Sequence, residues 1–409
     1  MSTEHSQLSR RGLLTGAAAT LTALATTQVA TAGGASAAAA GGTLVHLFLS
    51  GGLDGLSLVA PIDDPVLREA RPEQLLLTDR TALALDREFR LTSAFAPLEG
   101  YLKDGHLAFI PGASDPRLSR SHFQAVDACN LGGLPKDTGG RGWLDRLVDH
   151  LGAGTAFRSV GIGDTLPRSL VGANGALSLN SVEALKLNGE AKYADATLRA
   201  VKSLFAGINH PVESSVAAAV DALGAARTLA AAPYQPAPGV TYEDIGVAFR
   251  QVAQLIKGGA GVRVAAITSG GWDTHEKQGT ADGGYLHARL SELAQGLAAF
   301  FADLGDRAAD VTVLISSEFG RRVAANGTGT DHGHGGVVTL LSGRKLAGSL
   351  LGRWDGLAQL DGGDVPEFNN LFDVYGSVVQ GHFKLTDAQV RKVFPKRDYV
   401  PMKLFAAAP

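Results

Sequence analysis

Short apolar runs recur along the chain, and glycine and acidic residues follow them. The first run covers residues 44–49, ends in a Ser-Gly-Gly turn and has Asp54 just beyond it. Runs of this length and continuity predict strands that are buried on both faces of a sheet. Residues 335–348 resemble two further strands joined by a turn. Three other segments repeat the first pattern: 106–115, 261–279 and 310–322.

Helical patterns lie between these runs. Residues 285–305 place apolar side chains at helical spacing. The alternation of strand, glycine-rich loop and helix predicts an α/β fold with a mainly parallel central sheet flanked by helices. Ligands bind such sheets outside the carboxyl ends of the strands. The acidic residues and histidines fall at those ends, so we expect the functional site there.

Residues from about 181 to 258 do not follow this alternation. They are rich in alanine, have helical periodicity and carry no chemical motif. They predict an inserted helical section within one α/β domain that covers residues 43–409. Two placements remain open for this section: a cap over the site, or helices packed against one flank of the sheet.

Residues 1–37 have the pattern of a twin-arginine signal peptide and linker. Arg10 and Arg11 precede an uncharged run rich in Ala, Leu and Thr, and small-residue cleavage signals follow. Threonine and glycine dilute the apolar run, so we expect no stable membrane span after cleavage. The pattern predicts the twin-arginine export machinery as a partner and an extracellular, periplasmic or cell-wall location.

The composition narrows the function classes. The chain has 37 Lys and Arg against 40 Asp and Glu, a formal net charge of −3, so nothing indicates a nucleic-acid partner. The single cysteine, Cys129, excludes an internal disulfide and a cysteine-based zinc site. We expect it to pack as a small apolar residue inside a helix.

Candidate metal ligands come from four separated segments near the predicted strand ends. Carboxylates together with imidazoles suit zinc first, with manganese, iron or copper as alternatives. In "WDTH" and "DHGH" the paired side chains stand two residues apart, so each pair can project to one side of an extended loop. The candidates are Asp54, Asp273, His275, Glu318, Asp331, His332 and His334.

Structural roles compete with metal binding for several of these residues. An aspartate after a Gly-Gly turn, such as Asp54, is often a turn or cap residue. Glu318 can instead be the buried partner of Arg321 or Arg322. The case for a metal site therefore depends on all four segments meeting at one edge of the sheet.

A candidate nucleophile lies in "DPRLSRSHFQAVDACNLGG", where we expect a helix over residues 122–130. Ser121 at its amino terminus would benefit from the helix dipole, although serine also caps helices very often there. Ser119 is a second candidate. Arg120 and His122 stand beside them, and Arg120 and Arg321 are candidates for holding an anionic group.

Five stretches together resemble a known family. The twin-arginine start is followed by "LFLSGGLDGLS", "SRSHFQAVD", "GWDTH" and "SEFGRRVAANGTGTDHGHGG". They resemble an exported bacterial family of unknown function, domain-of-unknown-function family fifteen-oh-one. That family resembles a branch of the alkaline phosphatase superfamily, which also contains sulfatases and cofactor-independent phosphoglycerate mutases.

The resemblance implies an alkaline phosphatase-like sheet with a two-metal site. By position, Asp54 would match the first metal-binding aspartate and Ser121 the nucleophile. Asp273 and His275 would match the ligands of one metal. Glu318 would match the aspartate of the Asp-His pair that holds the other.

The final histidine ligand would be His334 or else His332. The sequence departs from the superfamily at Phe319, which stands where the pair has its histidine. No Cys-x-Pro-x-Arg stretch occurs either, so the formylglycine chemistry of sulfatases is not supported.

The resulting expectation is a secreted, metal-dependent hydrolase of phosphate or sulfate esters that uses a metal-activated serine or water. Its substrate would be an anionic small molecule or polymer. The alternative is an exported metal-binding protein without hydrolytic activity, acting in redox chemistry, metal handling or assembly of a partner enzyme.

Overall fold

An eight-stranded sheet forms the centre of the computed structural model, which describes residues 41–86, 88–186, 191–231 and 233–407. The strand order is β13-β5-β12-β9-β1-β8-β6-β7. In chain order the strands are β1 (Thr43–Leu49), β5 (Leu107–Ser114), β6 (Ser159–Ile162), β7 (Leu177–Leu179), β8 (Val264–Ser269), β9 (Val311–Ser316), β12 (Gly336–Ser342) and β13 (Asn369–Asn370).

The sheet is mainly parallel, as predicted. β1 pairs in parallel with both β8 and β9 at its centre. β12 is the exception, because it runs antiparallel to both β9 and β5. The other seven strands share one direction, so their carboxyl ends lie at the same edge of the sheet.

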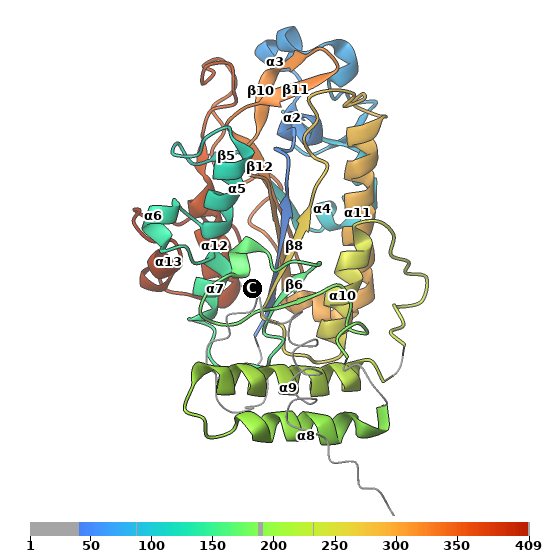
Figure 1. Ribbon diagram of the computed structural model, residues 1–409. Coiled ribbons are helices and arrows are strands. Elements are labelled where there is room, and N and C mark those ends of the chain that lie inside the picture. Colours follow the sequence, from blue (N-terminus) through green and yellow to red (C-terminus); the bar gives the residue numbers. More distant parts are fainter. Residues whose placement is uncertain (1–40, 87, 187–190, 232, 408–409) are drawn as a thin grey trace, which may run out of the picture.

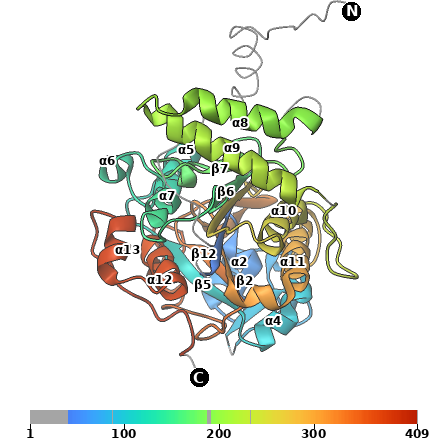
Figure 2. The ribbon, with the colours of Figure 1, turned by 90° about the horizontal axis from the view of Figure 1, so that it is seen from below.

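Helices cover both faces, because the central strands bury side chains on both. In β1, Val45 and Leu47 enter one hydrophobic core and Leu44 and Phe48 enter the other. Figures 1 and 2 show α10 and α11 on one side of the sheet and α7, α12 and α13 on the other. These helices are α7 (Trp143–Val148), α10 (Gly246–Lys257), α11 (Tyr285–Leu304), α12 (Leu371–Phe383) and α13 (Asp387–Val393).

Smaller elements complete the fold. A hairpin of β10 and β11 stands at the upper end in Figure 1, beside α2 and α3. The remaining elements are α2 (Gly55–Leu58), β2 (Val59–Pro61), α3 (Pro65–Ala70), β3 (Ala82–Ala84), β4 (Phe89–Thr92), α4 (Glu99–Lys103), α5 (His122–Leu131), α6 (Pro135–Thr138), β10 (Arg321–Asn326) and β11 (Gly329–His332).

The alanine-rich stretch forms α8 (Ala194–Phe205) and α9 (Pro211–Leu229) before it reaches α10. Figure 1 shows α8 and α9 at the lower end of the molecule, opposite the β10–β11 hairpin. They therefore do not cap the edge where the carboxyl ends of the strands lie. Their distance from that edge rules out the cap placement that the sequence left open.

Several sequence expectations need correction or fall outside the structure. Residues 335–348 form one strand, β12, rather than two, because the chain after Ser342 continues as a loop with a single bridge to Phe405. The short strands β6 and β7 were not predicted. The expected signal peptide, residues 1–37, lies outside the described residues.

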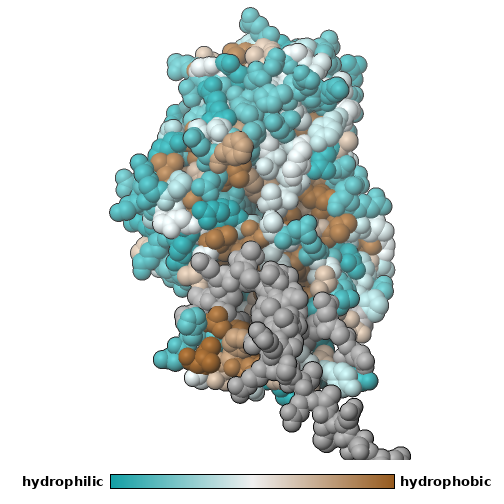
Figure 3. All heavy atoms as spheres, in the orientation of Figure 1, coloured by the Kyte–Doolittle hydropathy of each residue, from teal (hydrophilic) through white to brown (hydrophobic). Residues whose placement is uncertain are grey.

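The surface differs between the two ends of the molecule. Figure 3 shows mostly hydrophilic side chains over the upper end and a hydrophobic patch over the turn between α8 and α9. The exposed apolar residues there are Leu204 near the end of α8, Ile208 in the turn and Val212 near the start of α9. Among the described residues, no helix combines the length and apolar character needed to cross a bilayer.

Glycines let the loops after the strands approach one another closely. Gly51 and Gly52 follow β1 with φ angles of 134° and 70°, which favour glycine. A Cβ on Gly51 would lie 2.4 Å from the backbone nitrogen of Asp273, and one on Gly52 would lie 2.3 Å from the ring of Phe319. The loops after β1, β8 and β9 thus pack directly against each other.

Candidate metal centre

His122 is the first residue of α5, and Glu318 fixes its ring. The Nδ1 atom lies 2.7 Å from Oε1 of Glu318, a fully buried carboxylate that also accepts the backbone N–H of Gly51 at 2.9 Å. The Nε2 atom of His122 is buried and makes no hydrogen bond to any part of the chain that the structure describes. It faces Oδ2 of Asp273 at 3.4 Å.

Asp273 follows β8, and Arg321 holds it. The guanidinium donates to Oδ1 of Asp273 at 2.6 Å and also to the carbonyl oxygens of Gly51, Gly52 and Thr330. The Arg321 side chain is fully buried. It therefore positions Asp273 and joins the loops, a different role from the direct contact with an anionic group that the sequence predicts.

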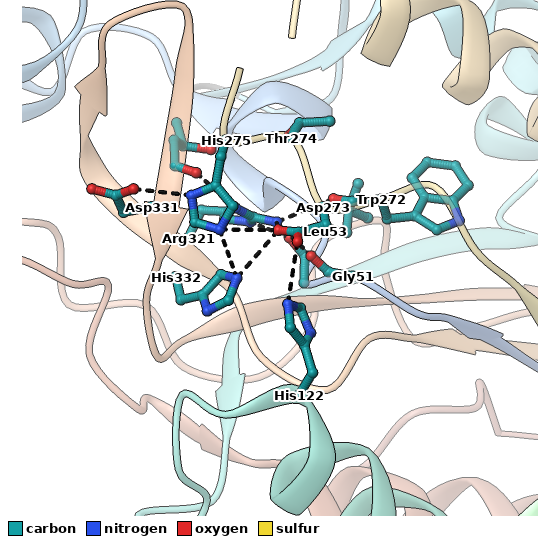
Figure 4. A network of polar contacts seen from close by, with 12 residues as sticks. Gly51, Leu53, His122, Trp272, Asp273, Thr274, His275, Arg321, Asp331 and His332 are labelled. Atoms are coloured by element: carbon teal, nitrogen blue, oxygen red, sulfur yellow. Dashed lines mark hydrogen bonds and ion pairs between the residues drawn. The ribbon is translucent and has the colours of Figure 1, made fainter. Parts of the chain in front are cut away.

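Two more histidines complete the cluster from the other side of Asp273 (Figure 4). His275 presents Nδ1 to Oδ1 of Asp331 at 3.0 Å, and His332 presents Nδ1 to the carbonyl oxygen of Arg120 at 3.0 Å. Their Nε2 atoms lie 2.9 Å apart. Both also lie close to Oδ1 of Asp273, at 3.1 and 3.2 Å.

The hydrogen-bond partners indicate which nitrogen of each ring carries the proton. All three Nδ1 atoms face carboxylate or carbonyl oxygens, which only accept. Each Nδ1 is therefore the donor, and each Nε2 turns a lone pair toward Asp273. Acceptor atoms that face one another at these distances repel unless a proton or a metal cation lies between them.

Burial and Arg321 set the charges of two members of the cluster. Burial lowers the pKa of His332, and the neighbouring Arg321 lowers it further. Burial raises the pKa of Asp273, but the hydrogen bond and charge of Arg321 outweigh it, so the pKa lies below its usual range. At neutral pH Asp273 is thus ionised and His332 is neutral.

The donor set fits a transition-metal ion. His122, Asp273 and His332 each offer one ligand atom, and these atoms lie within 4.8 Å of one another. Nitrogen and carboxylate donors of this kind suit zinc and its neighbours. His275 contacts two of the three and is a further donor. Glu318 and Asp331 orient the rings, as carboxylates behind metal-binding histidines often do.

Asp54 lies in a different network. Its two oxygens accept from Nη1 and Nη2 of Arg71 at 2.8 and 2.9 Å, and Gln278 and Ser57 donate to Oδ2. Burial raises the pKa of Asp54, but Arg71 outweighs it and the pKa is lowered. A carboxylate saturated in this way is a structural anchor for the loop after β1, and it stands apart from the cluster that the sequence predicts it to join.

His334 points away from the cluster as well. Its Nδ1 contacts Oδ2 of Asp361 at 3.1 Å and its Nε2 contacts the carbonyl oxygen of Asp115 at 3.2 Å. Glu318 and Asp331 contact the cluster indirectly, Glu318 at Nδ1 of His122 and Asp331 at Nδ1 of His275. Of the seven expected ligands, the structure thus brings Asp273, His275 and His332 directly together.

Ser121 occupies the N-cap position of α5, but in the described structure its hydroxyl caps no amide of that helix. It is exposed and immediately precedes His122. Cys129 is buried in the same helix, and burial raises the pKa of its thiol well above the usual value.

The sequence pattern grouped His122 with the catalytic candidates and did not reveal it as a possible metal ligand. It also missed Arg71, because a single arginine far from any motif carries no signal. The third omission is Asp364, a buried aspartate that forms ion pairs with Arg120 and Arg322.

The sequence matches over residues 113–374 the family described as "Protein of unknown function (DUF1501)". This match spans more than half of the chain. The chain belongs to this family. No curated protein matches the sequence.

Solved structures show a distant likeness. The PsFucS1 sulfatase from Pseudoalteromonas sp. is 13% identical with a TM-score of 0.35, covering 93% of this chain and 73% of that one. Ps i-CgsB in complex with k-i-k-neocarrahexaose is 8% identical with a TM-score of 0.36, covering 85% and 74%. The lipoteichoic acid synthase LtaP from Listeria monocytogenes is 10% identical with a TM-score of 0.23, covering 68% and 56%.

Proposed function

We propose that this member of the DUF1501 family is an exported, metal-dependent hydrolase of phosphate or sulfate esters. The observation that carries the proposal is the convergence of three imidazole Nε2 atoms on one carboxylate at the carboxyl edge of the sheet. His122, Asp273, His275 and His332 would hold the ion, zinc before manganese, iron or copper. A bound metal ion would supply a Lewis acid and lower the pKa of an attacking hydroxyl or water.

Arg120 is the residue of this chain best placed to bind the anionic group. Its backbone carbonyl contacts His332, so the residue lies beside the cluster. Its guanidinium pairs with the buried carboxylate of Asp364, yet the side chain is 47% exposed. A guanidinium that is held in place and still accessible suits a phosphate or sulfate oxygen.

Ser121 is the proposed nucleophile. Its hydroxyl is exposed and is not used in helix capping within the described structure, and it belongs to the turn between Arg120 and His122. The first backbone amides of α5 face that turn and favour negative charge. A water molecule acting in its place would leave the other roles unchanged, and Ser121→Ala separates the two.

The direct test measures metal content and ester hydrolysis together. We expect His122→Ala and His332→Ala to lose bound metal and hydrolysis of p-nitrophenyl phosphate or sulfate. His334→Ala is the matched control, because that histidine contacts Asp361 rather than the cluster. Metal bound equally by all three variants, or hydrolysis that survives chelation, would refute the proposal.

One observation favours a second candidate function, a non-hydrolytic metal-binding protein. Glu318 is fully buried against Gly51 and His122, and Phe319 is 3% exposed, so neither is placed to hold a second metal. A protein with one metal per chain, copper in the site and no esterase activity would match this candidate.

A further inference from the structure

A cavity of about 380 Å³ opens at the carboxyl ends of β6 and β8, on the same sheet edge as the histidine cluster. β6 ends at Ile162, which pairs with Ile267, so β8 extends beyond its neighbour there. Thr268 is consequently exposed although it lies in a central strand. The mouth of the cavity is completed by Val247 of α10, which is 48% exposed.

The lining of this cavity mixes apolar and polar groups. Ile162, Ile245, Val247 and Ile267 provide apolar surface. The polar groups are of every kind: the hydroxyls of Thr268 and Ser269, the amide of Asn180, the carboxylate of Asp244 and the guanidinium of Arg289. Cavities with apolar walls and a few convergent polar groups are the usual binding sites for small molecules.

Two glycines connect the cavity to the cluster. The chain leaves β8 at Ser269 and passes through Gly270 and Gly271 before it reaches Trp272 and Asp273. Both glycines are exposed, and a Cβ on Gly270 would meet no atom within 4 Å. A side chain at Gly270 would therefore project into open space along this segment.

Trp272 and Arg289 make this connection rigid. The indole is fully buried, and Figure 4 shows it directed away from the histidines on the far side of Asp273. Its Nε1 donates to Oγ of Ser269 at 3.3 Å, and the guanidinium of Arg289 lies over its ring at 5.3 Å. Arg289 also donates to the carbonyl oxygen of Gly270 at 3.0 Å.

An aromatic ring borders the glycine segment. Tyr285, at the start of α11, donates its hydroxyl to the carbonyl oxygen of Gly271 at 2.9 Å. The side chain is 47% exposed, so it offers a large and rigid amphipathic contact surface beside this path.

We propose that the cavity is a second subsite that binds a sugar ring of a substrate whose ester group lies at the histidine cluster. Sugar hydroxyls both donate and accept, which matches a lining with donors and acceptors of both signs. The lining residues, all within the described chain, include no aromatic side chain on which a nucleobase could stack. This inference rests on the proposed hydrolase function and names its substrate class, a carbohydrate ester of more than one ring.

The test uses Gly270→Leu in the mature protein. Gly270 has room for a side chain and no left-handed backbone, so the variant should fold normally while its side chain projects over the path. Gly100→Leu is the matched control, since a Cβ there also meets nothing within 4 Å. Thr268→Val is a second variant that removes one exposed hydroxyl without changing shape.

Kinetics with two substrate classes give the main result. We expect Gly270→Leu to raise the KM for phosphorylated or sulfated disaccharides about tenfold, the size of one added steric conflict. Hydrolysis of the p-nitrophenyl esters should be unchanged, as should both activities in Gly100→Leu. If Gly270→Leu changed the kinetics of both substrate classes equally, or of neither, the second subsite would be overturned. The hydrolase proposal would remain intact.

Binding gives an independent result if the wild-type protein hydrolyses no ester. Titration of the same disaccharide esters, followed by NMR, should then show saturable binding that Gly270→Leu and Thr268→Val weaken. No binding, or binding that both variants leave unchanged, would refute the subsite separately from the hydrolase function.

Discussion

The buried ion pair of Asp54 and Arg71 allows a test of whether Asp54 has a structural role or binds the metal. Both side chains are 1% exposed, and two hydrogen bonds of 2.8 and 2.9 Å join the guanidinium to the carboxylate. Asp54→Asn removes the negative charge and leaves the guanidinium buried without its counter-ion. Breaking a buried pair in this way costs about 3–5 kcal/mol in the free energy of unfolding.

Urea unfolding followed by circular dichroism measures this loss, and metal analysis of the folded fraction completes the assay. We expect Asp54→Asn to be destabilised by about 3–5 kcal/mol while it retains the metal content of the wild type. Asp63→Asn is the control, because Asp63 is 80% exposed in its pair with Arg68 and should change stability by no more than about 0.5 kcal/mol. Metal loss from Asp54→Asn with unchanged stability would refute the structural role.

The pH dependence follows from the lowered pKa of Asp54 in the folded protein. A carboxyl group whose folded pKa lies below its unfolded value, about 3.9, stabilises the fold fully above that pH. The stabilisation is lost as the pH falls through the folded pKa. The unfolding free energy of Asp54→Asn should therefore fall less steeply with acid than that of the wild type, and parallel curves would contradict the assignment.

Three further results are expected. Glu318→Gln should weaken metal affinity about ten- to a hundredfold by loosening the Nδ1 contact of His122, which metal titration measures. Cys129 should not react with a thiol reagent in the native protein and should react after unfolding, because the thiol is buried and its pKa is raised. Gly333→Ala should lower the melting temperature, since a Cβ there would lie 2.4 Å from the backbone of Arg321.

The sequence pattern predicted the central strands of the sheet, because strands buried on both faces are continuous apolar runs. β1, β5, β8 and β9 are continuous apolar runs, and each was predicted. β6 and β7 have only four and three residues, too few for a periodicity, and were missed. The sequence also could not predict that β12 runs antiparallel, since a buried strand has the same apolar pattern in either direction.

The ligands could be recognised by type, but the sequence could not show where their side chains point. Two pairs with i, i+2 spacing, Asp273 with His275 and His332 with His334, carried the same expectation, and only the first follows it. Asp273 and His275 both enter the cluster, whereas His332 enters and His334 turns away toward Asp361. The reason is that Gly333 packs against the backbone of Arg321, so the chain turns between β11 and β12.

The most informative departure from the resemblance is Phe319, which stands where the superfamily would have a histidine ligand. Its ring lies 5.0 Å from that of His122 and 4.6 Å from that of His332, measured between centroids. Gly52 leaves the space that this ring fills. The phenyl ring forms an apolar wall against both imidazoles on this side of the cluster. Phe319 thus supplies no ligand atom to the cluster and instead packs against two of its histidines.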